Sequence, residues 1–417
     1  MRRQVLLLLL PLLAAGCARS IPAAQVACTS EEPAVVAAAA SASLPIRRWG
    51  GGTLVDADGA PFVATFPEGF SSGEAVESWP GAAAIAGAPP AFRRLAGRSF
   101  VYDDALLALE RTARGDAAGA AQVLATLAAL QLGDGAWGFA FSLDEPFYDA
   151  GYVRAGTVAF AVYAFARYAE RFGDHRFRAY AGRGADWLLA QRDPATGLVR
   201  AGRGRWLDRG ATFEAGYRAD FFATEHQIDA FFALAALGRV DPGGPWAAGA
   251  AALERAILDR LWDDEAGRFL QGRGADGSPD PTSALDAAGA WGALFHLASG
   301  RRAEALRALD HVERHHRRGD RLLPRIGPDG AGPDTHFVEG AIGRALAWQR
   351  IDPARGAAAL EAIASFACAT GLPLLYADRW EEDFPRAPAA APTLWFLLAA
   401  REIAEGAPPF LWTSAGP

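Results

Sequence analysis

Two kinds of helical pattern alternate along the chain from about residue 99 to the C-terminus. Residues 154–168 carry apolar side chains on every side of the predicted helix, whereas residues 246–262 place Leu253, Ile257 and Leu261 on one face and charged residues on the other. A helix that is apolar all round must be surrounded by protein, and an amphipathic helix has one face in solvent. We therefore expect buried inner helices and half-exposed outer helices.

The two kinds of helix follow one another as pairs. Inner-type helices begin at intervals of roughly 50 to 70 residues, a spacing typical of helix-pair repeats, near Asp103, Arg154, Glu225, Asp286, Glu339 and Thr393. Outer-type helices lie between them, near residues 115–131, 176–191, 246–262, 301–318 and 353–369. Six apolar helices are fully covered if they close into a ring, whereas an open stack needs polar end caps. The pattern predicts an all-α fold, an (α/α)6 toroid over residues 99–412, in which the N-terminal segment replaces a missing sixth outer helix.

The first seventeen residues have the pattern of an export signal. Arg2 and Arg3 precede an apolar run over residues 5–13, and small residues then lead to Cys17. The run is too short to span a bilayer stably. Because the cysteine follows small residues directly, the segment resembles a bacterial lipoprotein signal peptide, which implies cleavage before Cys17 and lipidation of Cys17. An ordinary cleaved signal is the alternative; both predict export, and the lipid predicts anchoring to the cell envelope, at the periplasm or outer membrane.

Three further segments follow the signal peptide of residues 1–17. Residues 18–45 are rich in Ala, Ser and Pro and are expected to form a flexible tether. Residues 46–98 form an N-terminal extension whose residues 50–66 have the composition of a short β-hairpin. The toroid then occupies residues 99–412 as the catalytic domain.

Composition excludes several classes of protein. Apolar residues make up 51% and charged residues 21% of the 417, which excludes a disordered chain. All basic residues are arginine, so neither a Schiff-base lysine nor a Walker-type phosphate loop is possible. The net charge of −7 without a basic stripe argues against a nucleic-acid partner. No Cys/His or Asp spacing fits a zinc or EF-hand site, so no metal and no cofactor are expected.

Chemistry-bearing residues cluster where the inner helices begin. Inner helices of consecutive hairpins all point the same way, so their N-termini should gather at one mouth of the ring. Thr224 and Gln227 have the spacing of a capping box, which would make Thr224 the N-cap. Further N-caps are predicted at Ser99, at Ser283 and at Asp334 or Thr335. Each places an acid or a tyrosine just inside its helix.

Acidic side chains at these helix starts are the candidate catalytic residues. Glu225 and Glu339 are the leading candidates, and Asp103, Asp229 and Asp286 are supporting or substitute ones. Glycoside hydrolysis needs two carboxyl groups on either side of the scissile bond. The helix dipole suits a base, whereas a general acid needs a like-charge neighbour such as Asp229 beside Glu225. For each acid alone, a favourable position in the first helical turn is the structural alternative.

Aromatic, basic and imidazole groups accompany the acids. The predicted substrate-binding residues are Tyr102, Trp137, Arg154, His226, Trp291, His336, Tyr376 and Trp380. Flat aromatic faces suit the apolar faces of sugar rings, although each aromatic could also belong to the core. His226 or His336 could instead carry a proton to and from a carbon next to a carbonyl.

Several motifs together resemble a known superfamily. Residues 224–230 (TEHQIDA), 285–292 (LDAAGAWG) and 338–340 (VEG), with a similar tail over residues 371–410, resemble the six-hairpin (α/α)6 toroid glycosidase-like superfamily. The resemblance implies an (α/α)6 barrel that acts on glycans, usually with inversion by paired acids, in a superfamily that also holds phosphorylases, lyases and epimerases. Residues 131–137 (QLGDGAW) are also similar to the repeat motif of terpenoid cyclases, but the motif occurs once and without an Asp-rich partner.

Three functions are therefore compatible with the sequence. The first is an exported, lipid-anchored glycoside hydrolase whose partner is a poly- or oligosaccharide substrate. The second is a sugar epimerase or isomerase that uses His226 or His336. The third is a non-catalytic glycan-binding component of the cell envelope.

Overall fold

The chain is described here from a computed structural model, over residues 98–142, 151–207, 212–366, 374–379 and 388–413, together with 47–48, 61–62 and residue 384. The predicted signal peptide with Cys17, the tether of residues 18–45 and the predicted substrate-binding residue Trp380 lie outside these residues.

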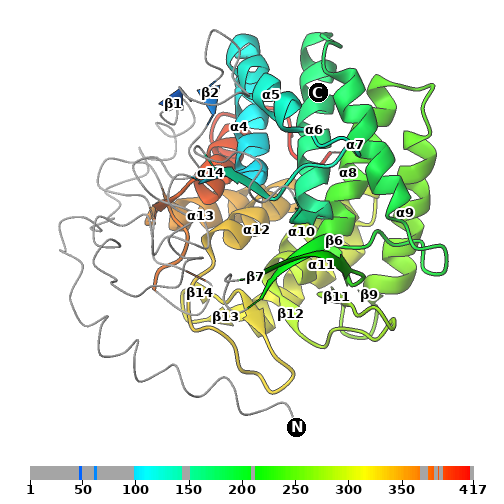
Figure 1. The fold of residues 1–417 in the computed structure, drawn as a ribbon. Coiled ribbons are helices and arrows are strands. Elements are labelled where there is room, and N and C mark those ends of the chain that lie inside the picture. The colour runs from blue at the N-terminus through cyan, green and yellow to red at the C-terminus, as the bar shows by residue number, and fades with distance from the viewer. Residues whose placement is uncertain are drawn as a thin grey trace, which may run out of the picture.

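Within the described residues, six helical elements form a closed inner ring (Figure 1). They are α4 (Val101–Arg114), α6 (Ala155–Phe172), α8 (Thr224–Val240), the π-helical turn η4 (Asp286–Ala290) that continues into α10 (Trp291–Ala298), α12 (Val338–Ile351) and α14 (Ala390–Ile403). Each packs on the next, and α14 packs on α4 to close the ring. The predicted (α/α)6 toroid is confirmed.

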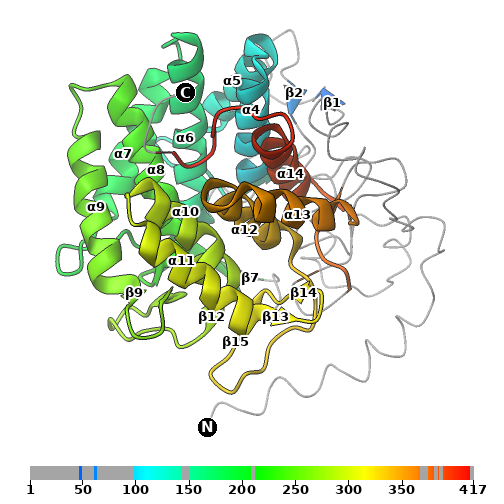
Figure 2. The ribbon, with the colours of Figure 1, turned by 180° about the vertical axis from the view of Figure 1, so that it is seen from behind.

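The outer helices return between the inner ones, as the alternating pattern predicts. They are α5 (Ala117–Leu130), α7 (Arg178–Ala190), α9 (Trp246–Leu261), α11 (Arg302–His311) with its π-helical extension η5 (Val312–His316), and α13 (Pro353–Ala364). Figure 2 shows α9, α11 and α13 lying outside the inner helices on the rear of the molecule. Residues 155–169 of α6 are buried on every side, whereas α9 buries one face that includes Leu253, Ile257 and Leu261. Inner and outer positions thus follow from how much of each helix is apolar.

A crown of short antiparallel strand pairs surrounds one end of the ring. Each inner helix is preceded by a short extended segment that pairs with a segment from a loop after an outer helix. The pairs are β3 (Arg98–Phe100) with β4 (Ala140–Ser142), β5 (Val153–Arg154) with β6 (Gly202–Leu207), β8 (Phe222–Ala223) with β11 (Gly272–Arg273), β12 (Ser283–Ala284) with β15 (Arg325–Ile326), Phe337 with Ala377, and β17 (Pro388–Ala389) with β16 (Leu374–Leu375). The N-termini of the inner helices therefore meet at this mouth.

One further strand and three further strand pairs complete the described fold. β7 (Thr212–Ala219) adds a third strand beside β6. Hairpins of β9 (Trp262–Asp263) with β10 (Arg268–Phe269) and of β13 (Arg317–Arg318) with β14 (Arg321–Leu322) follow the outer helices α9 and α11. β1 (Arg47–Arg48) and β2 (Pro61–Phe62) also pair antiparallel, but the residues between them are not described, so the hairpin over 50–66 stays a prediction.

Two absences concern the described part of the chain only. No sixth outer helix follows α14 there, and β2 lies against α5. None of its helices combines the length and the apolar character needed to cross a membrane.

The predicted N-caps are wrong, although the helices begin close to the expected positions. Thr224 is the first residue of α8, and its hydroxyl donates to the Leu270 carbonyl at 2.5 Å. The Gln227 side chain binds both backbone polar groups of Val199 instead of closing a capping box. Ser99 and Ser283 lie in strands β3 and β12.

The cap prediction also fails before α12, for the same physical reason. Neither Asp334 nor Thr335 caps this helix, whose N-cap is Phe337, and the Thr335 hydroxyl donates to Asp378. At these helix starts, carbonyls next to the crown strands accept the backbone N–H of the first helical residue, which has no partner within its own helix. Thr224 N–H donates to Gln271 O at 2.9 Å, and Val338 N–H donates to Tyr376 O at 3.2 Å.

Ser283 joins two buried histidines behind the strand crown. Its hydroxyl lies 3.1 Å from His311 Nε2 and 2.8 Å from His316 Nε2. His316 Nδ1 donates to the Leu323 carbonyl, which can only accept, so Nε2 of the neutral ring accepts from Ser283. Burial lowers the pKa of His311 to about 3 and that of His316 to about 4. Both rings are therefore neutral in the folded protein.

We expect His311 and His316 each to contribute a loss of stability as the pH falls below about 6.5, the ordinary pKa of histidine in an unfolded chain. In that range the unfolded histidines bind protons and the folded ones do not, until the pH reaches their lowered pKa. Each such histidine lowers the free energy of unfolding by up to about 1.4 kcal/mol per pH unit. Urea unfolding between pH 7.5 and 5 measures this slope. His316→Gln should reduce the slope and the exposed His175→Gln should not; equal slopes in the two variants would contradict the assignment.

Candidate active site

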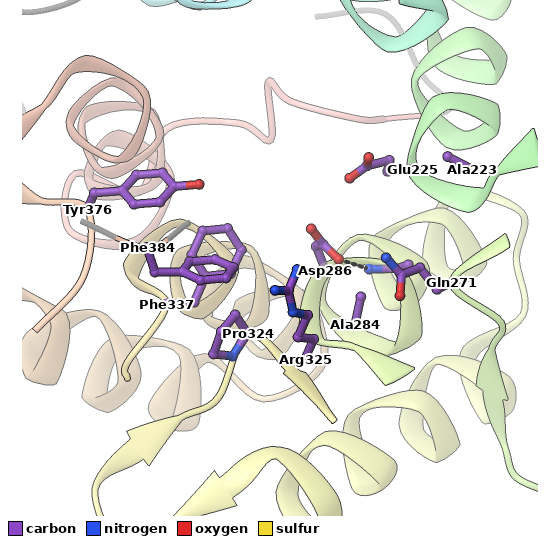
Figure 3. Close-up of a pocket in the computed structure, with 11 residues that line it drawn as sticks. Ala223, Glu225, Gln271, Ala284, Asp286, Pro324, Arg325, Phe337, Tyr376 and Phe384 are labelled. Carbon is purple, nitrogen blue, oxygen red and sulfur yellow. Dashed lines mark hydrogen bonds between the residues drawn. The ribbon is translucent and has the colours of Figure 1, made fainter. Parts of the chain in front are cut away.

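A cavity of about 170 Å³, open to water-sized molecules, lies at the mouth of the ring (Figure 3). Its wall comes from the starts of inner helices and from the strand crown. The lining residues are Ala223, Glu225, Gln271, Ala284, Asp286, Ala287, Pro324, Arg325, Phe337, Tyr376 and Phe384. The strand pairing explains this gathering, because Ala284 of β12 is in register with Arg325 of β15.

The cavity has an acidic side and an aromatic side (Figure 3). Glu225 and Asp286 lie on the acidic side. Phe337, Tyr376 and Phe384 pack against one another on the other side, with ring centroids 5.4 to 6.1 Å apart. Arg325 reaches up between the two sides, with its guanidinium 5.8 Å from the Phe384 centroid. Such a cavity offers hydrogen-bonding groups and a flat apolar surface together.

Glu225 has a pKa well above that of an ordinary glutamate. Burial is the main cause, and the neighbouring carboxyls of Asp286 and Glu339 add to it, so that the pKa rises to about 8. The Glu225 side chain is 43% accessible and lines the cavity. Glu225 is therefore protonated at neutral pH and able to donate a proton.

Asp286 ionises more readily than Glu225. Burial raises its pKa to about 6, against the opposing effect of backbone N–H groups at the start of η4. One of these, the N–H of Ala287, donates to Asp286 Oδ1 at 2.6 Å. Backbone donors at a helix start stabilise the carboxylate form. Asp286 is therefore the carboxylate of the pair at pH 7.

Glu339 lies beside the cavity and is held by two aromatic residues. It is 5% exposed, and its Oε1 accepts a hydrogen bond of 2.5 Å from the Tyr102 hydroxyl. The Tyr102 oxygen in turn accepts from Trp395 Nε1 at 2.7 Å. Burial raises the pKa of Glu339 to about 7, Tyr102 opposes the rise, and Asp286 adds to it.

The two remaining candidate acids belong to the same electrostatic neighbourhood. Burial raises the pKa of Asp229 well above its usual value, and Glu225, Asp286 and Glu339 raise it further. Asp103 is fully buried in the first turn of α4, and its charge is one of those that raise the pKa of Tyr376. The structure thus brings all five predicted acids to one end of the ring.

Two of the predicted polar residues stand beside these acids. His226 Nε2 lies 3.8 Å from Glu225 Oε1, and burial lowers the pKa of His226 to about 4 with a further contribution from Arg154. The His226 ring packs closely against Gly156 of α6, where a Cβ would lie 2.6 Å from the ring. Only glycine leaves room for the ring at this position. Arg154 donates to the carbonyls of Val153, Arg203 and Gly204, so its guanidinium holds the strand crown together.

Three predicted substrate-binding residues lie elsewhere. Trp137 is fully buried and donates to the Leu127 carbonyl within the helical core. Trp291 is 7% exposed and packs against other tryptophans inside the ring. His336 is stacked on Phe366, with ring centroids 4.6 Å apart. Burial of large rings stabilises the core, and Trp137, Trp291 and His336 are therefore packed in the interior and not on the cavity wall.

The sequence-based prediction missed several residues of the site. They are Gln271, Pro324, Arg325, Phe337 and Phe384 on the cavity wall and Trp395 behind Tyr102. Gln271 and Arg325 lie in the loops after outer helices, opposite the strands that lead into Glu225 and Asp286. The hairpin repeat could have predicted these two residues, because the loop after each outer helix must return to the mouth where the next inner helix begins. Within the described residues no three His, Cys, Asp or Glu side chains are arranged to hold a metal ion.

A closed ring of helical hairpins with acids at its mouth defines the class of this protein as an (α/α)6 toroid. No known protein family and no curated protein sequence matches the chain. Solved structures do match, at identities of 11–14% that establish the fold. A D-mannose isomerase is 12% identical with a TM-score of 0.56, and the match covers 74% of this chain and 88% of that one.

Two further similar structures are an epimerase and a mannanase, by their own descriptions. Cellobiose 2-epimerase from Bacillus thermoamylovorans is 11% identical with a TM-score of 0.53, over 72% of this chain and 88% of the epimerase. An α-mannanase of glycoside hydrolase family 76 from Bacteroides thetaiotaomicron is 12% identical with a TM-score of 0.51, over 74% and 88% of the two chains. Hydrolases and epimerases thus share this fold.

Proposed function

We propose that this protein is a glycoside hydrolase that acts on a poly- or oligosaccharide. One observation carries the proposal: Glu225 and Asp286 face one cavity, and their surroundings raise the two pKa values to about 8 and about 6. Two carboxyls with separated pKa values provide an acid and a base at the same pH. Glycoside hydrolysis requires this combination.

In this proposal each side of the cavity has its own task. The Glu225 carboxylic acid donates its proton to the glycosidic oxygen as the bond to the leaving sugar breaks. The Asp286 carboxylate either activates the attacking water or attacks the anomeric carbon itself, and the first course inverts and the second retains the configuration. The Phe337, Tyr376 and Phe384 rings offer a platform for the apolar face of a sugar ring.

Epimerisation is the alternative that the similar structures and His226 favour. His226 is neutral at pH 7 and lies next to Glu225, so it could accept a proton from a sugar carbon. The second predicted proton carrier, His336, is stacked on Phe366, and neither histidine is among the residues that line the cavity. Glu225 and Asp286 both line it, and this argues for the carboxyl pair.

Product analysis tests the proposal. The protein is incubated with a panel of oligosaccharides and polysaccharides, and new reducing ends and isomerised sugars are both measured. We expect new reducing ends in proportion to time and enzyme concentration. Isomerised sugar without new reducing ends would establish the epimerase, and binding without turnover of any glycan would establish a binding protein.

We also propose that the protein is exported and lipid-anchored through Cys17. The support is the basic, apolar and small-residue order of residues 1–17. Expression in a bacterium with labelled palmitate should give a labelled, membrane-associated protein, and Cys17→Ser should abolish the label. Label on Cys17→Ser, or none on the unsubstituted protein, would contradict lipidation.

A further inference from the structure

The C-terminal tail, residues 404–413, enters the ring from the end opposite the strand crown. In Figure 2 the red tail runs from α14 across the ring toward α6, while the labelled crown strands β12 and β15 lie at the other end. Near its end, Trp412 is 1% exposed and lies among rings from four inner helices. It is stacked on Phe232 at 5.4 Å and contacts Phe160, Trp291 and Trp395 at 5.2 to 6.1 Å.

Specific hydrogen bonds hold the tail in this position. The Tyr163 hydroxyl accepts from Trp412 N–H at 2.9 Å and donates to the Phe410 carbonyl at 3.2 Å. Arg350 donates to the carbonyls of Leu411 and Trp412 at 2.6 and 3.0 Å. Trp412 also adopts a φ of +48°, which a residue with a side chain rarely does. Its surroundings therefore fix its conformation tightly.

Trp412 supports Tyr102 of the candidate site through two neighbouring rings. Trp395 packs edge-on against Trp412 and donates its indole N–H to the Tyr102 oxygen. Phe160 also contacts Trp412, and it packs edge-on against the Tyr102 ring at 4.6 Å. Trp395 thus holds Tyr102 by a hydrogen bond, and Phe160 holds it by a ring contact. Both of these residues pack against Trp412. Its hydroxyl proton is directed at Glu339 Oε1.

We propose that Trp412 is a positioning residue, which keeps the Tyr102 hydroxyl aimed at Glu339 through Trp395 and Phe160. This inference rests on the proposed function only where turnover is measured, because the charge of Glu339 helps to raise the pKa of the proposed acid Glu225; the geometry itself does not depend on it. The consequence is that a residue of the C-terminal tail, buried among the inner helices, influences the proton affinity of a carboxyl at the mouth. Loss of the Tyr102 hydrogen bond should raise the pKa of Glu339, because that bond stabilises the carboxylate.

The test measures the pKa of Glu339 directly, by ¹³C NMR titration of glutamate carboxyl carbons with assignment through Glu339→Gln. Tyr102→Phe removes the donor and should raise this pKa by about one unit, since one hydrogen bond to a charged group corresponds to roughly that shift. Trp412→Leu should raise it in the same direction. The two changes together should shift the pKa by less than the sum of their separate effects, because they act on one bond.

A matched control separates positioning from general destabilisation. Trp187 is 5% exposed on the outer helix α7, so Trp187→Leu should destabilise the fold without moving the pKa of Glu339. If Trp412→Leu does not fold, Trp412→Phe keeps a ring in place and should give a smaller shift of the same sign. An unchanged pKa of Glu339 in the folded Trp412 variant would overturn the proposal.

The outcome is independent of whether the protein hydrolyses glycans. Where hydrolysis is found, Trp412→Leu should lower kcat several-fold with little change in KM, and Trp187→Leu should not. If the wild type has no turnover, the proposed function fails and the NMR titration still decides the inference. If Glu225→Gln is inactive and the Trp412 variant leaves the pKa of Glu339 unchanged, the inference alone fails.

Discussion

Glu225→Gln should reduce kcat/KM for a natural glycan by about a thousandfold, within the range of 10²–10⁴ that general acid catalysis contributes. The amide keeps the shape of the side chain but has no acidic proton to give to the leaving oxygen. The loss should be much smaller for an aryl glycoside whose leaving group departs without protonation. Steady-state kinetics on both substrates make the comparison. An equal loss on both would assign Glu225 a different role.

Folding must be intact in this variant for the result to count. Glutamine removes a group whose pKa is raised in the folded state, and such a group favours unfolding as the pH rises above its ordinary pKa. The free energy of unfolding of Glu225→Gln at pH 8 should therefore equal or exceed that of the wild type. Glu304→Gln, on the outer helix α11, is the matched control and should keep full activity.

Asp286→Asn should also abolish turnover, with a loss of about a thousandfold or more, but with a different substrate dependence. The carboxylate is needed to form the new bond at the anomeric carbon, whether it attacks directly or activates water. An activated leaving group therefore cannot compensate for its loss. Kinetics on the natural and the aryl substrates test this point. Asp310→Asn, an exposed acid on α11, serves as the control.

The pH profile of the wild type should identify the same two groups. Activity requires ionised Asp286 and protonated Glu225, so kcat/KM should rise as the pH passes about 6 and fall as it passes about 8. The fall at high pH should disappear in Glu225→Gln when an aryl glycoside is used. A profile in which this variant keeps the upper limb and loses the lower one would reverse the two assignments. The configuration of the first product, read by NMR, then distinguishes inversion from retention.

The helical repeat could be predicted from the sequence because it depends on local patterns of apolar and polar residues. The all-round apolar surface of α6 requires burial on every side, and the single apolar face of α9 requires burial on one side. A ring is the arrangement that covers six helices of the first kind. The acids at the helix starts could be found in the same way, since each lies at a fixed place in its hairpin. Position along a helix is a local property.

The caps and the cavity wall were not accessible in this way. Thr224 resembles an N-cap by spacing alone, but its hydroxyl bonds to Leu270, 46 positions along the chain. Trp395 reaches Tyr102 across 293 positions, and nothing near either residue indicates the contact. Trp137 and His336 lie near predicted helix starts in the sequence, yet Trp137 donates to the Leu127 carbonyl and His336 is stacked on Phe366, and neither lines the cavity.

The amino-acid order alone established a ring of paired helices with carboxyl groups at one end, because side-chain periodicity fixes which face of each helix is buried. The folded molecule decided which of those carboxyls face one cavity and how far the surroundings raise the pKa of each. That decision depends on burial and on charges brought together from separate hairpins, as Glu225, Asp286 and Glu339 are. Proton affinity is set by distance in space, and such distances exist only once the ring has closed.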